Sequence, residues 1–271
     1  KNLGVGAMSF LHRVITPLGI AAVLCGLPSA VVLAQYKFPP IAQGEAADFL
    51  NRGLQKARQG DYQGAIADYT LAIQSNPNSV EAYLNRGLAN HDLGDFNKAL
   101  ADFNQALRIN PNNAIALYNR GDAHMDVGNF TSALEDLNQA IRLNPNYAEA
   151  YNQRSVVYVN MGESQKSLAD LNQAIRLNPN YADAYYNRGK TRTELGDARG
   201  AIEDYNQALR RNPNLAEAYG NRGLLYYQMG NRQVALADLQ QAAQLFMKQG
   251  DRASYQQTLS YIQQVQQTSK P

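Results

Sequence analysis

The stretch VEAYLNRGLANHDLGDFNKALADFNQALRINPNN, residues 80–113, contains two helical patterns separated by a turn. Gly94 and Asp95 mark the turn, because glycine accepts positive φ and aspartate is a favoured N-cap for the helix that follows. Asn110 and Pro111 end the second pattern, since the residue before a proline avoids the helical region. The first helix carries Tyr83, Gly87, Leu88 and His91, and the i, i+3/i+4, i+7 stripe of the second consists of Phe96, Ala99, Leu100, Phe103, Ala106, Leu107 and Ile109.

The same pattern returns every 34 residues from position 46 to position 249, which gives six tandem repeats. Small residues at repeat positions 8, 20 and 27, aromatics near positions 4 and 24 and a proline at 32 resemble the tetratricopeptide repeat family. The resemblance covers residues 46–249. Three series keep the period: prolines 77, 111, 145, 179 and 213, glycines 60, 94, 128, 162, 196 and 230, and alanines 72, 106, 140, 174, 208 and 242.

The predicted fold class is all-α, a right-handed superhelical solenoid of six helix–turn–helix repeats. One helix pair cannot bury its apolar face alone, so neighbouring repeats must stack to form the core. Residues 250–271 are expected to form a C-terminal capping helix and tail. There Asp251 caps a helix over 252–267, and the predicted covering face is Tyr255, Leu259, Ile262 and Gln266. A partner-binding amphipathic helix is the alternative for this segment.

The charge balance and the single cysteine exclude several functions. Four of the charged residues, Lys1, Arg13, Lys37 and Glu45, precede the repeats, and the other 22 basic and 22 acidic residues balance. A neutral body disfavours nucleic acid, which needs a basic stripe. Cys25 alone permits no disulfide framework. Because no phosphate loop, nucleophile elbow or metalloprotease motif is present, we expect no enzymatic activity, no small-molecule substrate and no cofactor.

Residues 1–34 are predicted to be a signal peptide or a membrane anchor. Val14 to Ala34 carries no charge and follows Lys1, His12 and Arg13. A cleaved signal would end before Gln35, whereas a retained segment is just long enough to span a bilayer. An apolar helix inside a soluble domain is the third interpretation. Either a signal peptide or a membrane anchor would place the repeats on the periplasmic or lumenal side of the membrane. Residues 35–45 are expected to form a proline-containing linker.

Two complete rows of charged residues follow the repeat. The simplest interpretation is a ladder of ion pairs between helices, because the planar guanidinium pairs bidentately with a carboxylate. The alternative is an arginine row that binds anionic ligands. Position 7 holds Arg52, Arg86, Arg120, Arg154, Arg188 and Arg222, and position 23 holds Asp68, Asp102, Asp136, Asp170, Asp204 and Asp238.

An amide row at position 6 is the predicted peptide-binding site. In the resembled family this position faces the groove, where an amide can donate to and accept from an extended backbone; the alternative is an amide that only caps or bridges helices. The row consists of Asn51, Asn85, Asn119, Gln153, Asn187 and Asn221, with Tyr118, Tyr186, Tyr227 and Lys190 nearby. Groove acids are Glu81, Glu149, Asp183, Glu217, Asp92, Asp126, Glu194 and Asp122. Acids and aromatic faces predict an extended, neutral-to-basic protein segment as the partner.

A metal site is not predicted. His91 and His124, near Asp92 and Asp126, could in principle hold zinc, but they do not share the i, i+4 spacing of a helical ligand pair. Groove or packing roles are commoner for such histidines.

These features predict a protein-interaction scaffold. Envelope members of the resembled family often assemble membrane complexes, so the resemblance implies an adaptor or assembly factor on the non-cytoplasmic side of a membrane. The alternative is a stable structural subunit of a membrane complex, held partly through residues 14–34.

Overall fold

A computed structural model of the chain describes residues 44–267, and these residues form helices without a strand. The predictions for residues 1–43 and for the last four residues lie outside this range. None of the described helices is long and apolar enough to cross a bilayer. The all-α repeat prediction is confirmed.

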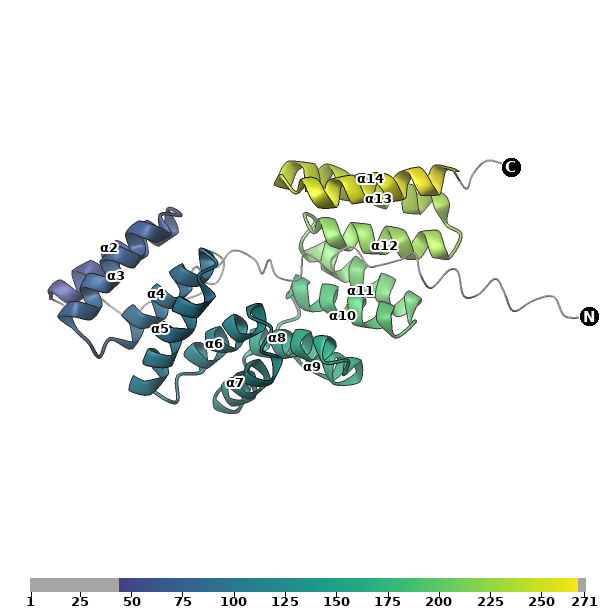
Figure 1. Cartoon of the computed structure of the whole chain (residues 1–271). Helices are drawn as coiled ribbons and strands as arrows, with labels where there is room; N and C mark the ends of the chain where they lie inside the picture. Colours follow the sequence, from purple (N-terminus) through teal and green to yellow (C-terminus); the bar gives the residue numbers. More distant parts are fainter. Residues whose placement is uncertain (1–43, 268–271) are drawn as a thin grey trace, which may run out of the picture. The chain divides into compact units, whose positions relative to one another are not determined.

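The helices fall into two compact units, each taken by itself below. Figure 1 shows how helices alternate along the chain, each first helix of a repeat followed by its second. One unit contains α2 (Glu45–Arg58), α3 (Tyr62–Ser75), α4 (Val80–Asp92), α5 (Phe96–Ile109), α6 (Ala114–Asp126), α7 (Phe130–Leu143), α8 (Ala148–Asn160) and α9 (Ser164–Leu177). The other contains α10 (Ala182–Glu194), α11 (Ala198–Arg211), α12 (Ala216–Gln228), α13 (Arg232–Gln249) and α14 (Arg252–Gln267).

The turns within repeats depend on a glycine with positive φ. Gly94 adopts φ +79°, which a side chain would strain. The N-cap predicted at Asp95 is only half right. Asp95 precedes α5, but its carboxylate binds Lys98 Nζ at 2.6 Å and makes no cap bond. The equivalent Asp61 does accept from the backbone N–H of Gly64.

Small residues allow the two helices of each repeat to approach closely. A Cβ on Gly87 would lie 2.6 Å from Phe103 Cε1, whereas a Cβ on Gly121 would lie 3.1 Å from Leu137 Cγ. An aromatic residue at position 24 therefore requires glycine at position 8, and leucine there leaves more room. The fourth repeat accordingly has Ser155 before Leu171. The alanines at position 20, such as Ala99, are fully buried.

The C-terminal helix α14 packs on α13, as predicted for a cap. Asp251 Oδ1 accepts from the Ser254 N–H. The predicted covering face is partly wrong. Thr258, Tyr261 and Val265 are buried, whereas Gln266 is exposed. Val265 packs against apolar residues of α12 and α13, and the neighbouring Gln266 points to solvent, because burying an amide without a hydrogen-bond partner costs free energy.

Candidate peptide-binding face

Within the unit formed by α2 to α9, the first helices of consecutive repeats form one continuous face. In the α2–α9 unit, α2 contacts α4, α4 contacts α6, and α6 contacts α8. Successive second helices of this unit make no contact of similar extent. First helices therefore lie on the inner side of the curve, and we call their surface the first-helix face.

The six amides of the predicted row differ in burial and bonding. Asn119 and Asn221 are only 4% and 5% exposed, whereas Asn51 is open to solvent. Asn85 donates from Nδ2 to the backbone oxygen of Glu81 at 2.8 Å, so its amide is used within its own helix. The sequence predicted six equivalent amides, whereas in the structure they differ in solvent exposure and in hydrogen-bond partners.

The two buried asparagines retain unused hydrogen-bonding atoms. Asn119 Nδ2 has no hydrogen-bond partner. Asn221 Nδ2 donates to the Tyr186 hydroxyl at 3.3 Å, but its Oδ1 has no partner. A buried polar atom without a partner costs about 1–3 kcal/mol. An extended backbone offers both the acceptor and the donor that these amides lack.

Of the two remaining amides, Gln153 contacts the preceding repeat. Its Nε2 donates to Asp122 Oδ1 and lies 3.7 Å from Met125 Sδ. In Asn187, the backbone oxygen accepts from the Thr191 hydroxyl at 3.0 Å.

Aromatic rings and a lysine lie beside the amides. Tyr118 packs on Tyr147 with ring centroids 5.1 Å apart, and Tyr186 packs on Tyr205 at 6.0 Å. Lys190 Nζ lies 5.9 Å from the centre of the Tyr186 ring. Burial lowers the pKa of Lys190, although Glu194 and Glu217 oppose the shift.

Two acidic residues share helix α10 with Lys190: Asp183 is half-buried and Glu194 is exposed. Burial, and next the charge of Glu217, raise the pKa of Asp183. Burial also raises the pKa of Glu194, against the effect of Lys190. A cationic ligand group would stabilise the charged form of these carboxylates.

The arginine and aspartate rows form the predicted ladder. Arg120 shows the geometry, with Nε 2.8 Å from Asp136 Oδ2 and Nη2 2.6 Å from Asp136 Oδ1. Its Nη1 donates to Asn104 Oδ1 of the preceding repeat at 2.7 Å. All six arginines pair with the aspartate sixteen residues later. Because every one of these guanidinium groups is paired with a carboxylate, and only the Arg52 side chain is as much as 51% exposed, the row is not a free anion-binding surface.

The second partner of these arginines was missed from the sequence. Arg86 reaches the Thr70 hydroxyl, and Arg154 reaches Asn138, in each case sixteen residues earlier. These polar residues at position 25 recur with the period, which is the signal that could have revealed them.

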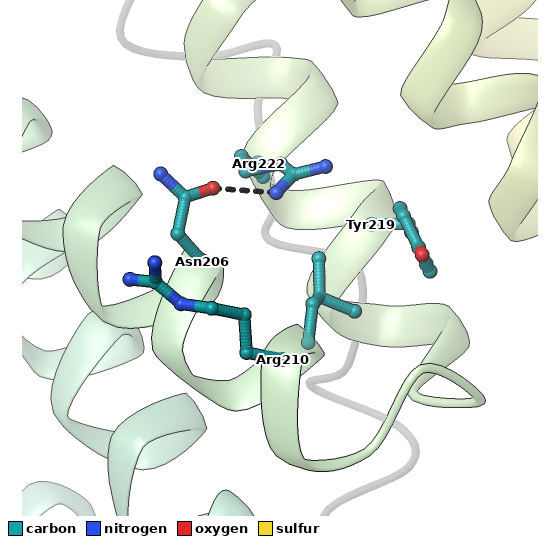
Figure 2. A pocket seen from close by; sticks show the side chains of 5 residues that line it. Asn206, Arg210, Tyr219 and Arg222 are labelled. Carbon is teal, nitrogen blue, oxygen red and sulfur yellow. Dashed lines mark hydrogen bonds between the residues drawn. The ribbon is translucent and has the colours of Figure 1, made fainter.

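A shallow pocket of about 370 Å³ lies between α11 and α12, away from the amide row. Its lining residues are Asn206, Leu209, Arg210, Tyr219 and Arg222. Figure 2 shows the bond from Arg222 to Asn206 that closes one side. Of the two arginines that line the pocket, Arg222 belongs to the ladder and is already bonded to Asp238.

The two described histidines lie in different surroundings. His91 contacts Asp126, which the sequence had placed near it, and also Asp122, which the sequence had not grouped with it. His124 lies near Asp136 instead, and burial lowers its pKa while Asp136 opposes the shift. The zinc grouping of His91 with His124 therefore does not form.

Family models agree with the repeat geometry. A tetratricopeptide repeat model matches residues 80–113 and another matches 216–246. A TPR repeat model matches 53–94, 121–162, 157–196 and 189–230. The chain belongs to the tetratricopeptide repeat family. Proteins with these repeats act as protein-interaction scaffolds, and the fold is typically non-enzymatic.

Solved structures with the same fold include several bacterial tetratricopeptide proteins. A crystal structure of MamA is 30% identical, with a TM-score of 0.54 over 61% of this chain and 96% of that one. PilF of Pseudomonas aeruginosa is 17% identical, with a TM-score of 0.68 over 80% and 97%. YrrB, described as a TPR protein with an unusual peptide-binding site, is 23% identical, with a TM-score of 0.52 over 71% and 97%. No curated protein matches the chain.

Proposed function

We propose that this tetratricopeptide repeat protein is an adaptor that binds an extended protein segment along its first-helix face. The observation that carries the proposal is Asn119, a buried amide whose Nδ2 has no partner in the fold. Asn221 in the sixth repeat is also buried, and its side-chain oxygen Oδ1 has no hydrogen-bond partner. In each unit taken by itself, a backbone group that reached the buried amide would satisfy it without regard to the side chains of the segment.

The chemistry of the neighbouring side chains favours a neutral-to-basic segment. Burial raises the pKa of the half-buried Asp183 and of the more exposed Glu194, and a nearby positive charge would stabilise the charged form of both. Tyr186 offers an aromatic face already in contact with a lysine ammonium, which is the geometry of a cation–π contact.

A peptide-display experiment tests the binding mode. Linear peptides selected on the whole chain are measured by fluorescence anisotropy against Asn119→Ala and Asn221→Ala. We expect each variant to weaken binding about five- to tenfold, which corresponds to roughly 1–1.4 kcal/mol for one hydrogen bond. The control is Asn97→Ala, an exposed asparagine on the second helix α5, which should leave affinity unchanged. Equal affinity of all three variants and wild type would remove the amide row from the binding site.

We further propose that the adaptor works in assembly of a membrane complex, with its repeats on the non-cytoplasmic side. The uncharged segment 14–34 behind Arg13 supports this orientation. Protease added to spheroplasts expressing the whole chain should digest the repeats while a cytoplasmic control protein survives. Digestion only after lysis would contradict the orientation. Stoichiometric recovery with one complex after salt washing would instead identify a structural subunit.

A further inference from the structure

One cluster of potential metal ligands on the first-helix face is unused by the proposed peptide binding. His91 Nε2, in the last turn of α4, lies 2.6 Å from Asp126 Oδ2 and 3.7 Å from Asp122 Oδ2 on α6. One ligand atom from each residue lies within 4.8 Å of the other two. Asp122 and Asp126 are four residues apart, so both carboxylates lie on the same side of α6.

The charges in this cluster do not balance. The six aspartates of the ladder each have an arginine, but within residues 44–267 Asp122 and Asp126 bond only His91 and Gln153 and no lysine or arginine. Even a protonated His91 leaves one net negative charge. The three side chains are only 18%, 30% and 9% exposed for His91, Asp122 and Asp126.

Neighbouring side chains orient the cluster in the way that outer groups orient metal ligands. Gln153 on α8 donates to Asp122 Oδ1, which leaves Oδ2 as the oxygen on the His91 side. Phe96 meets the His91 ring edge to face, with centroids 5.2 Å apart and an interplanar angle of 68°. The cluster is thus held by three successive repeats.

The distances suit a small cation. Bonds of about 2.0–2.2 Å in a tetrahedral arrangement place ligand atoms roughly 3.3–3.5 Å apart. The two separations from His91 Nε2, 2.6 Å and 3.7 Å, fall on either side of this range. A simple histidine–aspartate pair explains the shorter distance. It does not explain why a second carboxylate is held beyond hydrogen-bond distance of the same nitrogen.

We propose that His91, Asp122 and Asp126 bind a divalent transition-metal ion of the Zn²⁺ class, with a fourth coordination position left for water or for a donor from a bound segment. One imidazole nitrogen and two carboxylates suit zinc, cobalt or nickel, whereas magnesium and calcium prefer all-oxygen sites. The site does not depend on the proposed peptide binding.

Metal titration of the whole chain tests the site after treatment with a chelator and dialysis. Calorimetry with ZnCl₂ should give one saturable site per chain, and Co²⁺ should give the visible absorption of a four- or five-coordinate ion. His91→Gln and Asp126→Asn should each weaken binding at least about tenfold. MgCl₂ in excess should not compete.

Control variants separate this site from adventitious histidine binding. His124→Gln changes the other described histidine, which lies outside the cluster, and should leave zinc affinity unchanged. Zinc should raise the unfolding midpoint of wild type and His124→Gln but not of Asp126→Asn, because only bound metal stabilises the folded state. Circular dichroism confirms that each variant is folded.

Absence of saturable zinc binding by the wild type, or undiminished binding by a His91→Gln/Asp126→Asn double variant, would overturn the proposal. Peptide affinity measured in the presence of chelator tests the proposed adaptor function separately. Failure of one proposal is therefore distinguishable from failure of the other.

Discussion

Replacing Arg120 with leucine tests whether the ladder stabilises the repeats. The carboxylate of Asp136 is only 7% exposed and accepts two bonds from Arg120. Removing the arginine leaves a buried charge without its cation, which costs about 3–5 kcal/mol. Asp136→Asn should cost less, about 1–3 kcal/mol, because the Arg120 side chain is 25% exposed and can reach water.

The double variant Arg120→Leu/Asp136→Asn should be more stable than the sum of the single losses predicts. We expect a coupling energy of about 1.5–3 kcal/mol, the range for hydrogen bonds to charged groups. Urea unfolding followed by far-ultraviolet circular dichroism measures it, since the chain has no tryptophan. A coupling below about 0.5 kcal/mol would refute the reasoning, because independent sites add to within that margin.

A second double-mutant cycle measures the hydrogen bond between Arg120 and Asn104, which joins two neighbouring repeats. Arg120 Nη1 to Asn104 Oδ1 is a single bond to a neutral, exposed side chain, so Arg120→Leu with Asn104→Ala should couple by only about 0.5–1.5 kcal/mol. Arg142→Leu is the matched control. Arg142 is exposed and bonds only Gln139 in its own helix, so its loss should stay within about 0.5 kcal/mol.

Three further predictions use the same unfolding measurement. Gly87→Ser should cost about 1–3 kcal/mol by collision with an aromatic ring, and Gly121→Ser should cost clearly less; equal losses would contradict the packing argument. Asp251→Ala should lose about 1 kcal/mol at pH 7. Bonds from Ser254 lower the pKa of Asp251 in the folded state, so its stabilising effect is present above about pH 4 and lost as pH falls through the folded pKa. A difference between wild type and variant that persists unchanged at pH 2 would show that the carboxylate charge is irrelevant. Val265→Asn should cost about 2–4 kcal/mol by burying an amide in the cap, while Gln263→Asn, on the exposed side of α14, should be neutral.

Periodicity made most of the fold predictable from sequence. A glycine at position 15 of the repeat and a proline at position 32 fix where each helix ends, because their backbone restrictions are local. The pairing of Arg120 with Asp136 was also predictable, since complementary charges recur at a constant offset on the two helices of one repeat.

Features that depend on competition between neighbours were not predictable. Asp95 occupies the N-cap position of α5, but its carboxylate accepts from the Lys98 ammonium instead of a backbone N–H. The buried face of α14 was misassigned. Val265 and Gln266 are adjacent, and both fit the helical spacing from Ile262, so the periodicity alone does not show which one is buried. The amide row is nearly uniform in sequence, yet the surroundings bury Asn119 and Asn221 and leave Asn51 exposed.

The contact of His91 with Asp122 and Asp126 joins two repeats, and the period does not specify it. Equivalent positions in the fourth repeat hold Val156 and Asn160, so the cluster is a local departure from the repeated pattern. The i, i+4 spacing of the two aspartates was visible, but the third ligand comes from the packing of α4 on α6.

The double reach of the ladder arginines bears on how the chain can change length in evolution. Four of them bond one partner sixteen residues ahead and another sixteen residues behind: Arg86, Arg120, Arg154 and Arg222. Removing residues 114–147 as a block would bring Asn104 to the place that Asn138 now holds before Arg154. Loss or gain of a whole 34-residue module therefore regenerates every bond of the ladder. An insertion of any other length inside a helix would separate an arginine from its partners. The ladder permits growth and shortening in complete modules, while the histidine–aspartate cluster would disappear with the third one.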